Sequence, residues 1–115
     1  MKEIEISIKI RHYQLEELPE EERELVNTAI KATDNAYADY SHFYVGAALR
    51  LSDGTVVIGA NQENAAYPSG LCAERTAIFA AQANHLDKHI TCLAIAARND
   101  NGLLKSAFTP CGACR

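Results

Sequence analysis

The segment Cys72-Ala73-Glu74, together with the distant Pro110-Cys111-Gly112-Ala113-Cys114, decides how this sequence is interpreted. Three thiols, those of Cys72, Cys111 and Cys114, can close around one zinc ion and leave its fourth tetrahedral position open. An open position on zinc is a catalytic arrangement, because it holds a water molecule whose pKa the metal lowers. The sequence therefore predicts a catalytic zinc site built from these two segments.

Both cysteine segments lie where a loop is expected to become a helix. The N-terminal end of a helix carries about half a positive charge, which favours thiolate over thiol. Glu74 is predicted to take a proton from the metal-bound water and deliver it to a substrate nitrogen. Arg75 lies one helical turn after Cys72, so we expect its guanidinium to offset the charge of the thiolates. The alternatives are a glutamate that only favours the helix dipole and an ordinary surface arginine.

The fourth cysteine, Cys92, allows an alternative, because four thiols can also form a closed structural zinc site. Cys92 lies in the apolar run 90–97, where a free cysteine behaves as a small apolar residue, and we favour that interpretation. His85 and His89 are four residues apart and superficially resemble a helical metal pair. They are better explained as residues around a helix C-terminus, where imidazolium suits the dipole.

Length, charge and cysteine use set broad limits. A chain of 115 residues predicts one domain. The formal net charge of −4, with Lys and Arg scattered singly, argues against a duplex nucleic-acid surface. No apolar run approaches the roughly 20 residues that span a bilayer, and Met1-Lys2-Glu3 does not open a signal peptide. We therefore expect a cytoplasmic protein whose cysteines are thiols or metal ligands, with neither a membrane nor a nucleic acid as partner.

Hydrophobic patterning predicts the first elements. Isoleucines alternate with polar residues over 4–10, which predicts a strand, either at a sheet edge or as an arm that pairs with another subunit. Pro19 and the acidic run Glu20-Glu21-Glu22 predict a helix start. Apolar and small residues at three- and four-residue steps, continuing to Tyr37, predict the buried face of that helix.

The middle of the chain predicts a hairpin followed by a helix and a strand. The β-rich runs 43–51 and 55–60 flank Ser52-Asp53-Gly54, which is typical of a hairpin turn. A loop then leads to an alanine-rich helix over about 73–84, whose small face could lie close to a sheet or to a neighbouring helix. The run 90–97 has the length and apolar character of a strand covered on both faces.

Four segments carry a resemblance to a known family. They read SHFYVGAAL over 41–49, NQENAAY over 61–67, CAERTA over 72–77 and PCGACR over 110–115. Together they strongly resemble cytidine deaminase of the short, three-cysteine type, from about Asp39 to the last residue. The resemblance implies a layered α/β domain, with a mixed sheet and helices on both faces, that assembles as a homotetramer.

The resemblance also implies roles for individual residues. The implied zinc ligands are Cys72, Cys111 and Cys114. Glu74 is implied to shuttle protons, and Phe43 to help wall the pyrimidine pocket. Asn61 and Glu63 are implied to bind the ribose hydroxyls; because they lie two residues apart at a strand end, both can face one side.

The implied reaction is the hydrolytic deamination of cytidine or deoxycytidine to the uridine product and ammonia, a step of pyrimidine salvage. One alternative is a related zinc deaminase of another aminated base or nucleoside. The acidic net charge and the Asn61 and Glu63 pair favour a free nucleoside. The other alternative is a non-catalytic zinc domain in which Cys92 completes a closed site.

The sequence departs from the family at both ends. The N-terminal arm, residues 1–18, is not a usual part of the short enzyme. The family also continues past its last cysteine with the rest of a helix and further strands, whereas this sequence ends at Arg115. We therefore expect a single domain over 1–115 that lacks the family's C-terminal part, and a polypeptide of that length to be inactive on cytidine.

Overall fold

The computed structural model describes residues 2–7, 9, 11–63 and 70–103 of the chain. The predicted ligands Cys111 and Cys114, and the helix start expected beside them, lie outside the described residues. Within the described part, four strands form one antiparallel sheet in the order β2-β1-β3-β4. Their bounds are Tyr44–Leu51 for β1, Val56–Ala60 for β2, Ile90–Asn99 for β3 and Gly102–Leu103 for β4.

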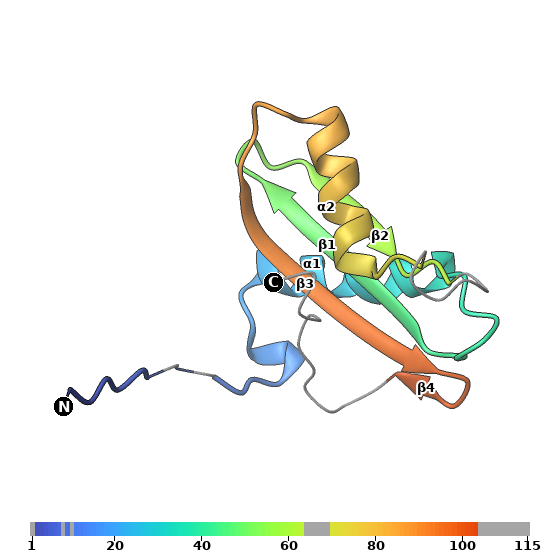
Figure 1. Cartoon of the computed structure of the whole chain (residues 1–115), viewed down its shortest axis with the longest axis horizontal. Coiled ribbons are helices and arrows are strands. Elements are labelled where there is room, and N and C mark those ends of the chain that lie inside the picture. The colour runs from blue at the N-terminus through green and yellow to red at the C-terminus, as the bar shows by residue number, and fades with distance from the viewer. Residues whose placement is uncertain (1, 8, 10, 64–69, 104–115) are drawn as a thin grey trace.

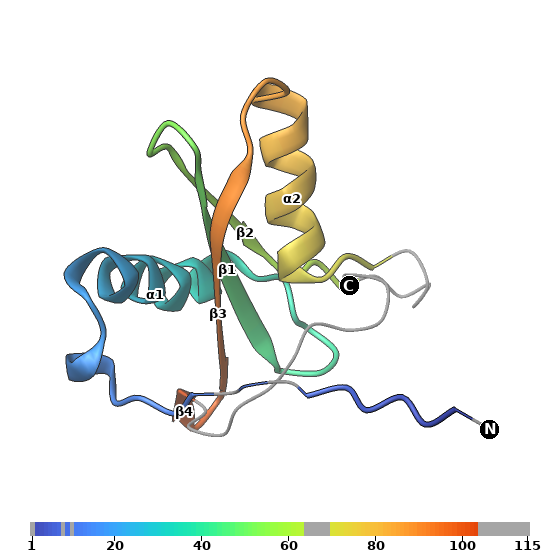
Figure 2. The ribbon, with the colours of Figure 1, turned by 90° about the vertical axis from the view of Figure 1, so that its left-hand side faces the viewer.

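Two helices cover opposite faces of this sheet, as Figure 2 shows most directly. Helix α1 (Glu20–Ala32) packs on β1 and β3, and helix α2 (Ala73–Asn84) packs on β1 and β2. Neighbouring residues of β1 point to opposite faces: Ala48 contributes to the core under α1, and Leu49 to the core under α2. The predicted α/β layering is therefore confirmed. Pairing between the described strands is antiparallel throughout, so the parallel pair expected of a mixed sheet is not among them.

Helix α1 begins where the sequence predicts, with Pro19 as its N-cap and three glutamates in its first turn. Leu25 and Ala29 are fully buried against the sheet. The predicted buried face extended too far, however. The α-helix ends at Ala32 and continues only as a short 3-10 turn, Thr33–Asn35, so Tyr37 lies beyond it and is 50% exposed.

The β1–β2 hairpin is confirmed. Gly54 has a φ of 91°, a conformation that glycine adopts without strain, and the Leu51 amide donates to the Thr55 carbonyl across the turn at 2.8 Å. Strand β3 is confirmed but is covered on both faces only near its centre. Ala96 and Ala97 are buried, whereas Leu93 is 38% exposed because α2 lies over β1 and β2.

The N-terminal isoleucine segment does not form the predicted edge strand. Among its described residues none belongs to a strand, and Ile4 and Ile6 are 86% and 82% exposed. In Figure 1 this segment runs away from the sheet and ends far from it. The alternation gives β-propensity, but a strand also needs a partner to supply its hydrogen bonds, and none of the described strands pairs with this segment.

No helix in the described part of the chain is long and apolar enough to cross a membrane.

Gly59 of β2 sets how closely α2 approaches the sheet. A Cβ atom at this position would lie 2.6 Å from the Ala73 carbonyl oxygen and would also overlap the Ala77 amide nitrogen. Because both obstacles are backbone, the helix would have to move. We expect Gly59→Ala to lower the free energy of unfolding by about 3 kcal/mol, at the upper end of overpacking effects, as measured by urea denaturation.

The matched control for this change is Ile58→Ala on the same strand, since Ile58 is 43% exposed. That substitution should alter stability by no more than about 0.5 kcal/mol. Equal stability of the Gly59→Ala variant and the unsubstituted protein would mean that α2 does not rest on β2 as described.

Candidate metal and catalytic site

Cys72 lies at the N-terminal end of α2, as the sequence predicts. It is the N-cap residue, with extended backbone angles of φ −78° and ψ 162°. Its carbonyl oxygen accepts hydrogen bonds from the Thr76 amide at 3.1 Å and the Thr76 hydroxyl at 2.9 Å, which closes the first helical turn. The cysteine therefore occupies the positive end of a helix of 12 residues.

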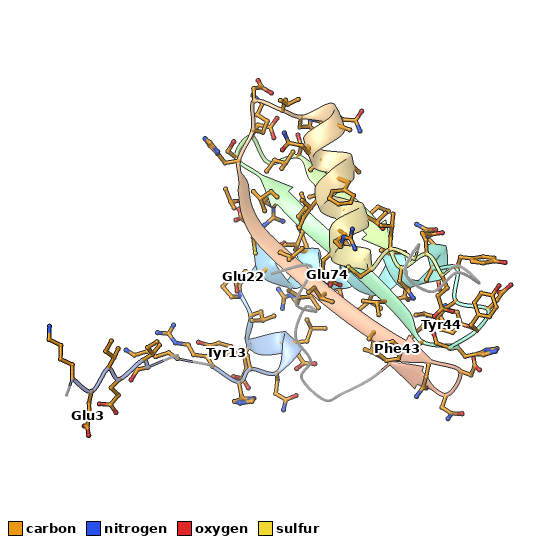
Figure 3. All side chains as sticks on the ribbon, viewed as in Figure 1. Glu3, Tyr13, Glu22, Phe43, Tyr44 and Glu74 are labelled. Carbon is orange, nitrogen blue, oxygen red and sulfur yellow. The ribbon has the colours of Figure 1, made fainter. Side chains whose placement is uncertain are left out.

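Glu74 lies in the same first turn and is buried, with only 5% of its surface exposed. Burial removes water from the carboxylate and raises the pKa of Glu74 above its ordinary value. Figure 3 labels Glu74 at the end of α2 where the helix begins. A carboxyl group whose pKa is raised accepts and returns a proton in a catalytic step more readily than a fully solvated glutamate does.

Arg75 makes its described contact away from the first turn. Its guanidinium lies over the ring of Phe79, one turn further along α2, at 5.5 Å from the ring centroid. Phe79 is 51% exposed, so this pair lies on the outer side of the helix. The predicted role of Arg75 beside the thiolates stays a prediction.

The structure brings Phe43, Asn61 and Glu63 together. Phe43 directly precedes β1 and is 38% exposed, while Asn61 and Glu63 follow the end of β2. The Asn61 side chain bonds with the backbone on both sides of Tyr44. Its amide group donates to the Phe43 carbonyl at 2.9 Å, and its oxygen accepts from the Val45 amide at 2.8 Å.

Glu63 reaches the same segment from the same side. Its Oε1 atom accepts from the backbone amides of Tyr40 and Ser41, each at 3.0 Å. Hydrogen bonds from Ser41, and less strongly from Tyr40, hold the pKa of Glu63 below its ordinary value. The stability that this carboxylate contributes is present above the ordinary glutamate pKa and is lost as the pH falls through the lowered value.

A polar cluster beside Phe43 was missed by the sequence interpretation. Asp100 contacts His42 Nδ1 at 3.1 Å and accepts from the Tyr44 hydroxyl at 3.3 Å. Arg98 lies over the Tyr44 ring at 4.4 Å from its centroid. His42 and Asp100 are far apart in sequence, and the antiparallel pairing of β1 with β3, which sets Tyr44 opposite Arg98, brings them together. No local spacing signals the contact.

The interpretation of Cys92 as a core residue agrees with its position. Cys92 lies on β3 and packs against the core beneath α1. Cys72 lies at the start of α2, on the opposite face of the sheet. A site holding both sulfurs would have to pass through the sheet, which argues against a closed four-cysteine centre.

The chemistry of the described residues fits a zinc ion. A cysteine at a helix N-terminus supplies a thiolate ligand, and a buried carboxyl group follows it by two residues. Among the described residues, no three His, Cys, Asp or Glu side chains form a group that could hold a metal. Two of the three predicted ligands, Cys111 and Cys114, fall outside those residues.

The fold is a layered α/β domain, and the comparison with known families identifies it as zinc-binding. The family model described as "Cytidine and deoxycytidylate deaminase zinc-binding region" matches residues 19–115. The chain belongs to this family, and zinc is its metal.

Relatives with known names belong to the same family. The protein named cytidine deaminase from Halalkalibacterium halodurans is 45% identical over 91 residues, which cover 79% of this chain and 64% of the relative. The crystal structure of cytidine deaminase from Burkholderia pseudomallei superposes with a TM-score of 0.69 at 40% identity, covering 79% of this chain and 68% of that one. The structure of the Mycobacterium tuberculosis cytidine deaminase gives 0.68 at 36% identity, covering 79% of this chain and 69% of that one. The chain thus spans slightly less than two thirds of the H. halodurans relative.

Proposed function

We propose that the protein is a zinc-dependent hydrolase that converts cytidine or deoxycytidine and water into the uridine product and ammonia. The observation that carries this proposal is the first turn of α2, where Cys72 caps the helix and Glu74 is buried two residues later. Membership of the deaminase family and the names of the relatives support it.

Cys72 would hold the metal together with Cys111 and Cys114. When bound, zinc supplies a water molecule of lowered pKa as the nucleophile. Glu74 would take a proton from the attacking water and deliver it to the ring nitrogen beside the reacting carbon. It would then pass the remaining proton, from the hydroxyl newly added to that carbon, to the departing amine. The carbon–nitrogen bond to that amine breaks as the carbonyl of the uridine product forms. Of the two protons of the water, one is then on the ring nitrogen and the other on ammonia.

In this proposal the contacts with the nucleoside belong to Phe43, Asn61 and Glu63. Phe43 would lie against the pyrimidine ring, and Asn61 and Glu63 would bind the ribose hydroxyls. Asn61 and Glu63 can form further hydrogen bonds besides those to the backbone. The amide of Asn61 retains a second N–H, and the carboxylate of Glu63 retains acceptor sites.

A free nucleoside is the favoured substrate because the net charge of −4 does not suit a phosphate backbone. The test is a substrate panel of cytidine, deoxycytidine, deoxycytidylate and a cytosine-containing single-stranded oligonucleotide, with product read by chromatography. We expect the two nucleosides to react fastest. A preference for the oligonucleotide would replace this proposal with deamination of polynucleotides.

Assembly as a homotetramer and a cytoplasmic location belong to the same proposal. The alanine face of α2 does not support subunit packing, because Ala73, Ala77 and Ala81 are buried against the chain's own sheet. Support comes instead from Phe79 and Leu86, which are 51% and 74% exposed. Thiolate ligands also require a reducing compartment. Light scattering that gives the mass of one chain would contradict the tetramer.

A further inference from the structure

We propose that the segment Asn61-Gln62-Glu63 is a positioning element that fixes Phe43 relative to the start of α2, in addition to any contact with ribose. The proposal rests on the proposed function only for its catalytic consequence. Its structural part concerns residues 40–45, which are the loop that carries Phe43 and the first two residues of β1, and which we call the Phe43 loop.

The first step is that two side chains hold the Phe43 loop from both ends. Glu63 accepts from the amides of Tyr40 and Ser41 at its beginning, each at 3.0 Å. Asn61 bonds with the Phe43 carbonyl and the Val45 amide at its end. These four backbone groups would otherwise need water or another strand as partner. The loop that carries Phe43 is therefore shaped by Asn61 and Glu63.

The second step is that Gln62, between them, holds the chain next to Cys72. The Gln62 amide donates to the Leu71 carbonyl at 2.7 Å, and the Leu71 amide donates back to the Gln62 carbonyl at 2.8 Å. Leu71 directly precedes the N-cap residue of α2. Three consecutive residues therefore connect the proposed pyrimidine wall with the proposed metal ligand.

The third step is that the Phe43 loop needs such support. His42 has a positive φ of 55°, an uncommon conformation for a residue with a side chain. Its amide donates to the Ala38 carbonyl at 3.0 Å, which closes a tight turn just before Phe43. A loop with this backbone keeps one conformation only when neighbouring groups hold it.

The structural arm of the test measures hydrogen exchange of individual amides by NMR. In Asn61→Ala the Val45 amide should exchange roughly 3- to 10-fold faster, the factor for one hydrogen bond of ordinary net strength. The matched control is Asn84→Ala, which removes an amide that bonds only with a carbonyl in its own helix, that of Ala80. An unchanged Val45 rate in Asn61→Ala would overturn the proposal.

A conservative variant of Glu63 tests whether its hydrogen bonds, rather than its negative charge, hold the Phe43 loop. Glu63→Gln keeps an oxygen that can accept from Tyr40 and Ser41, so both amides should stay protected. Glu63→Ala should release them by roughly 3- to 10-fold. Faster exchange in the glutamine variant, equal to that of the alanine variant, would contradict positioning through these hydrogen bonds. If Asn61→Ala fails to fold, this pair still decides the question.

The catalytic arm compares cytidine with 2′,3′-dideoxycytidine, which lacks the 2′ and 3′ hydroxyls of the ribose. If Asn61 acts by positioning, Asn61→Ala should lower kcat by about 10²-fold on both substrates, because a small misplacement of a pocket wall has an effect of that size. A loss confined to cytidine and expressed in KM would mean that Asn61 acts only on the ribose, which overturns the catalytic part of the proposal. If the unsubstituted protein deaminates neither substrate, the proposed function fails, while the exchange measurements still decide the structural claim.

Discussion

Replacing Glu74 with glutamine in the full-length protein is expected to lower kcat for cytidine by at least ~10²-fold while the zinc content stays the same. The amide has the size of the carboxylate, so the buried space beside α2 stays filled, and Glu74 is only 5% exposed. Glutamine cannot accept and return a proton, however. Turnover and metal content measured on the same preparation check the prediction.

The control for Glu74 is Glu22→Gln. Glu22 is also a first-turn glutamate of a helix, but it is exposed. If Glu74 only favoured the helix dipole, the two variants would each lose at most about 1 kcal/mol of stability and would keep full activity. A fully active Glu74→Gln protein would show that another group moves the protons.

Replacing Cys72 with serine is expected to remove zinc and activity together. Each chain should bind one zinc ion, and the variant should retain only a small fraction of it, because a hydroxyl is a far weaker zinc ligand than a thiolate. Serine is a favoured N-cap residue, so α2 should remain intact. Elemental analysis and circular dichroism of the same samples separate loss of metal from loss of fold.

Cys92→Ser is the matched control for Cys72. Cys92 lies beneath α1, on the other face of the sheet, so its substitution should leave zinc at the level of the unsubstituted protein. Equal loss of zinc in the two variants would favour a closed structural site and contradict a catalytic centre with three thiols.

Local patterns in the sequence were sufficient for most of the fold. The SDG turn, the helix start at Glu20 and the helix after Cys72 are specified by residues within a few positions of each other, and the structure confirms them. The isoleucine arm shows the limit of such patterns. Alternation reports the propensity for a strand, whereas a strand also needs a neighbour, which no local pattern encodes.

In the candidate site, too, contacts between neighbours in sequence could be predicted and contacts between distant segments could not. The spacing between Cys72 and Glu74 places both in one helical turn, so their proximity could be predicted. The bonds between Asn61 and the Phe43 loop depend on how β1 pairs with β2 and could not be. Arg75 lies over Phe79, one turn further along α2, and its predicted role beside the thiolates stays a prediction because two of those thiols lie outside the described residues.

The most direct test of the central claim is cytidine deamination by the full-length protein, its length verified by intact mass, before and after removal of zinc. We predict that uridine and ammonia form in equal amounts, that chelation abolishes the reaction, and that zinc restores it in the unsubstituted protein and in Cys92→Ser but not in Cys72→Ser. Zinc-loaded, folded protein that forms no uridine, or deamination that continues without zinc, would contradict the assignment of the α2 start as a zinc deaminase site.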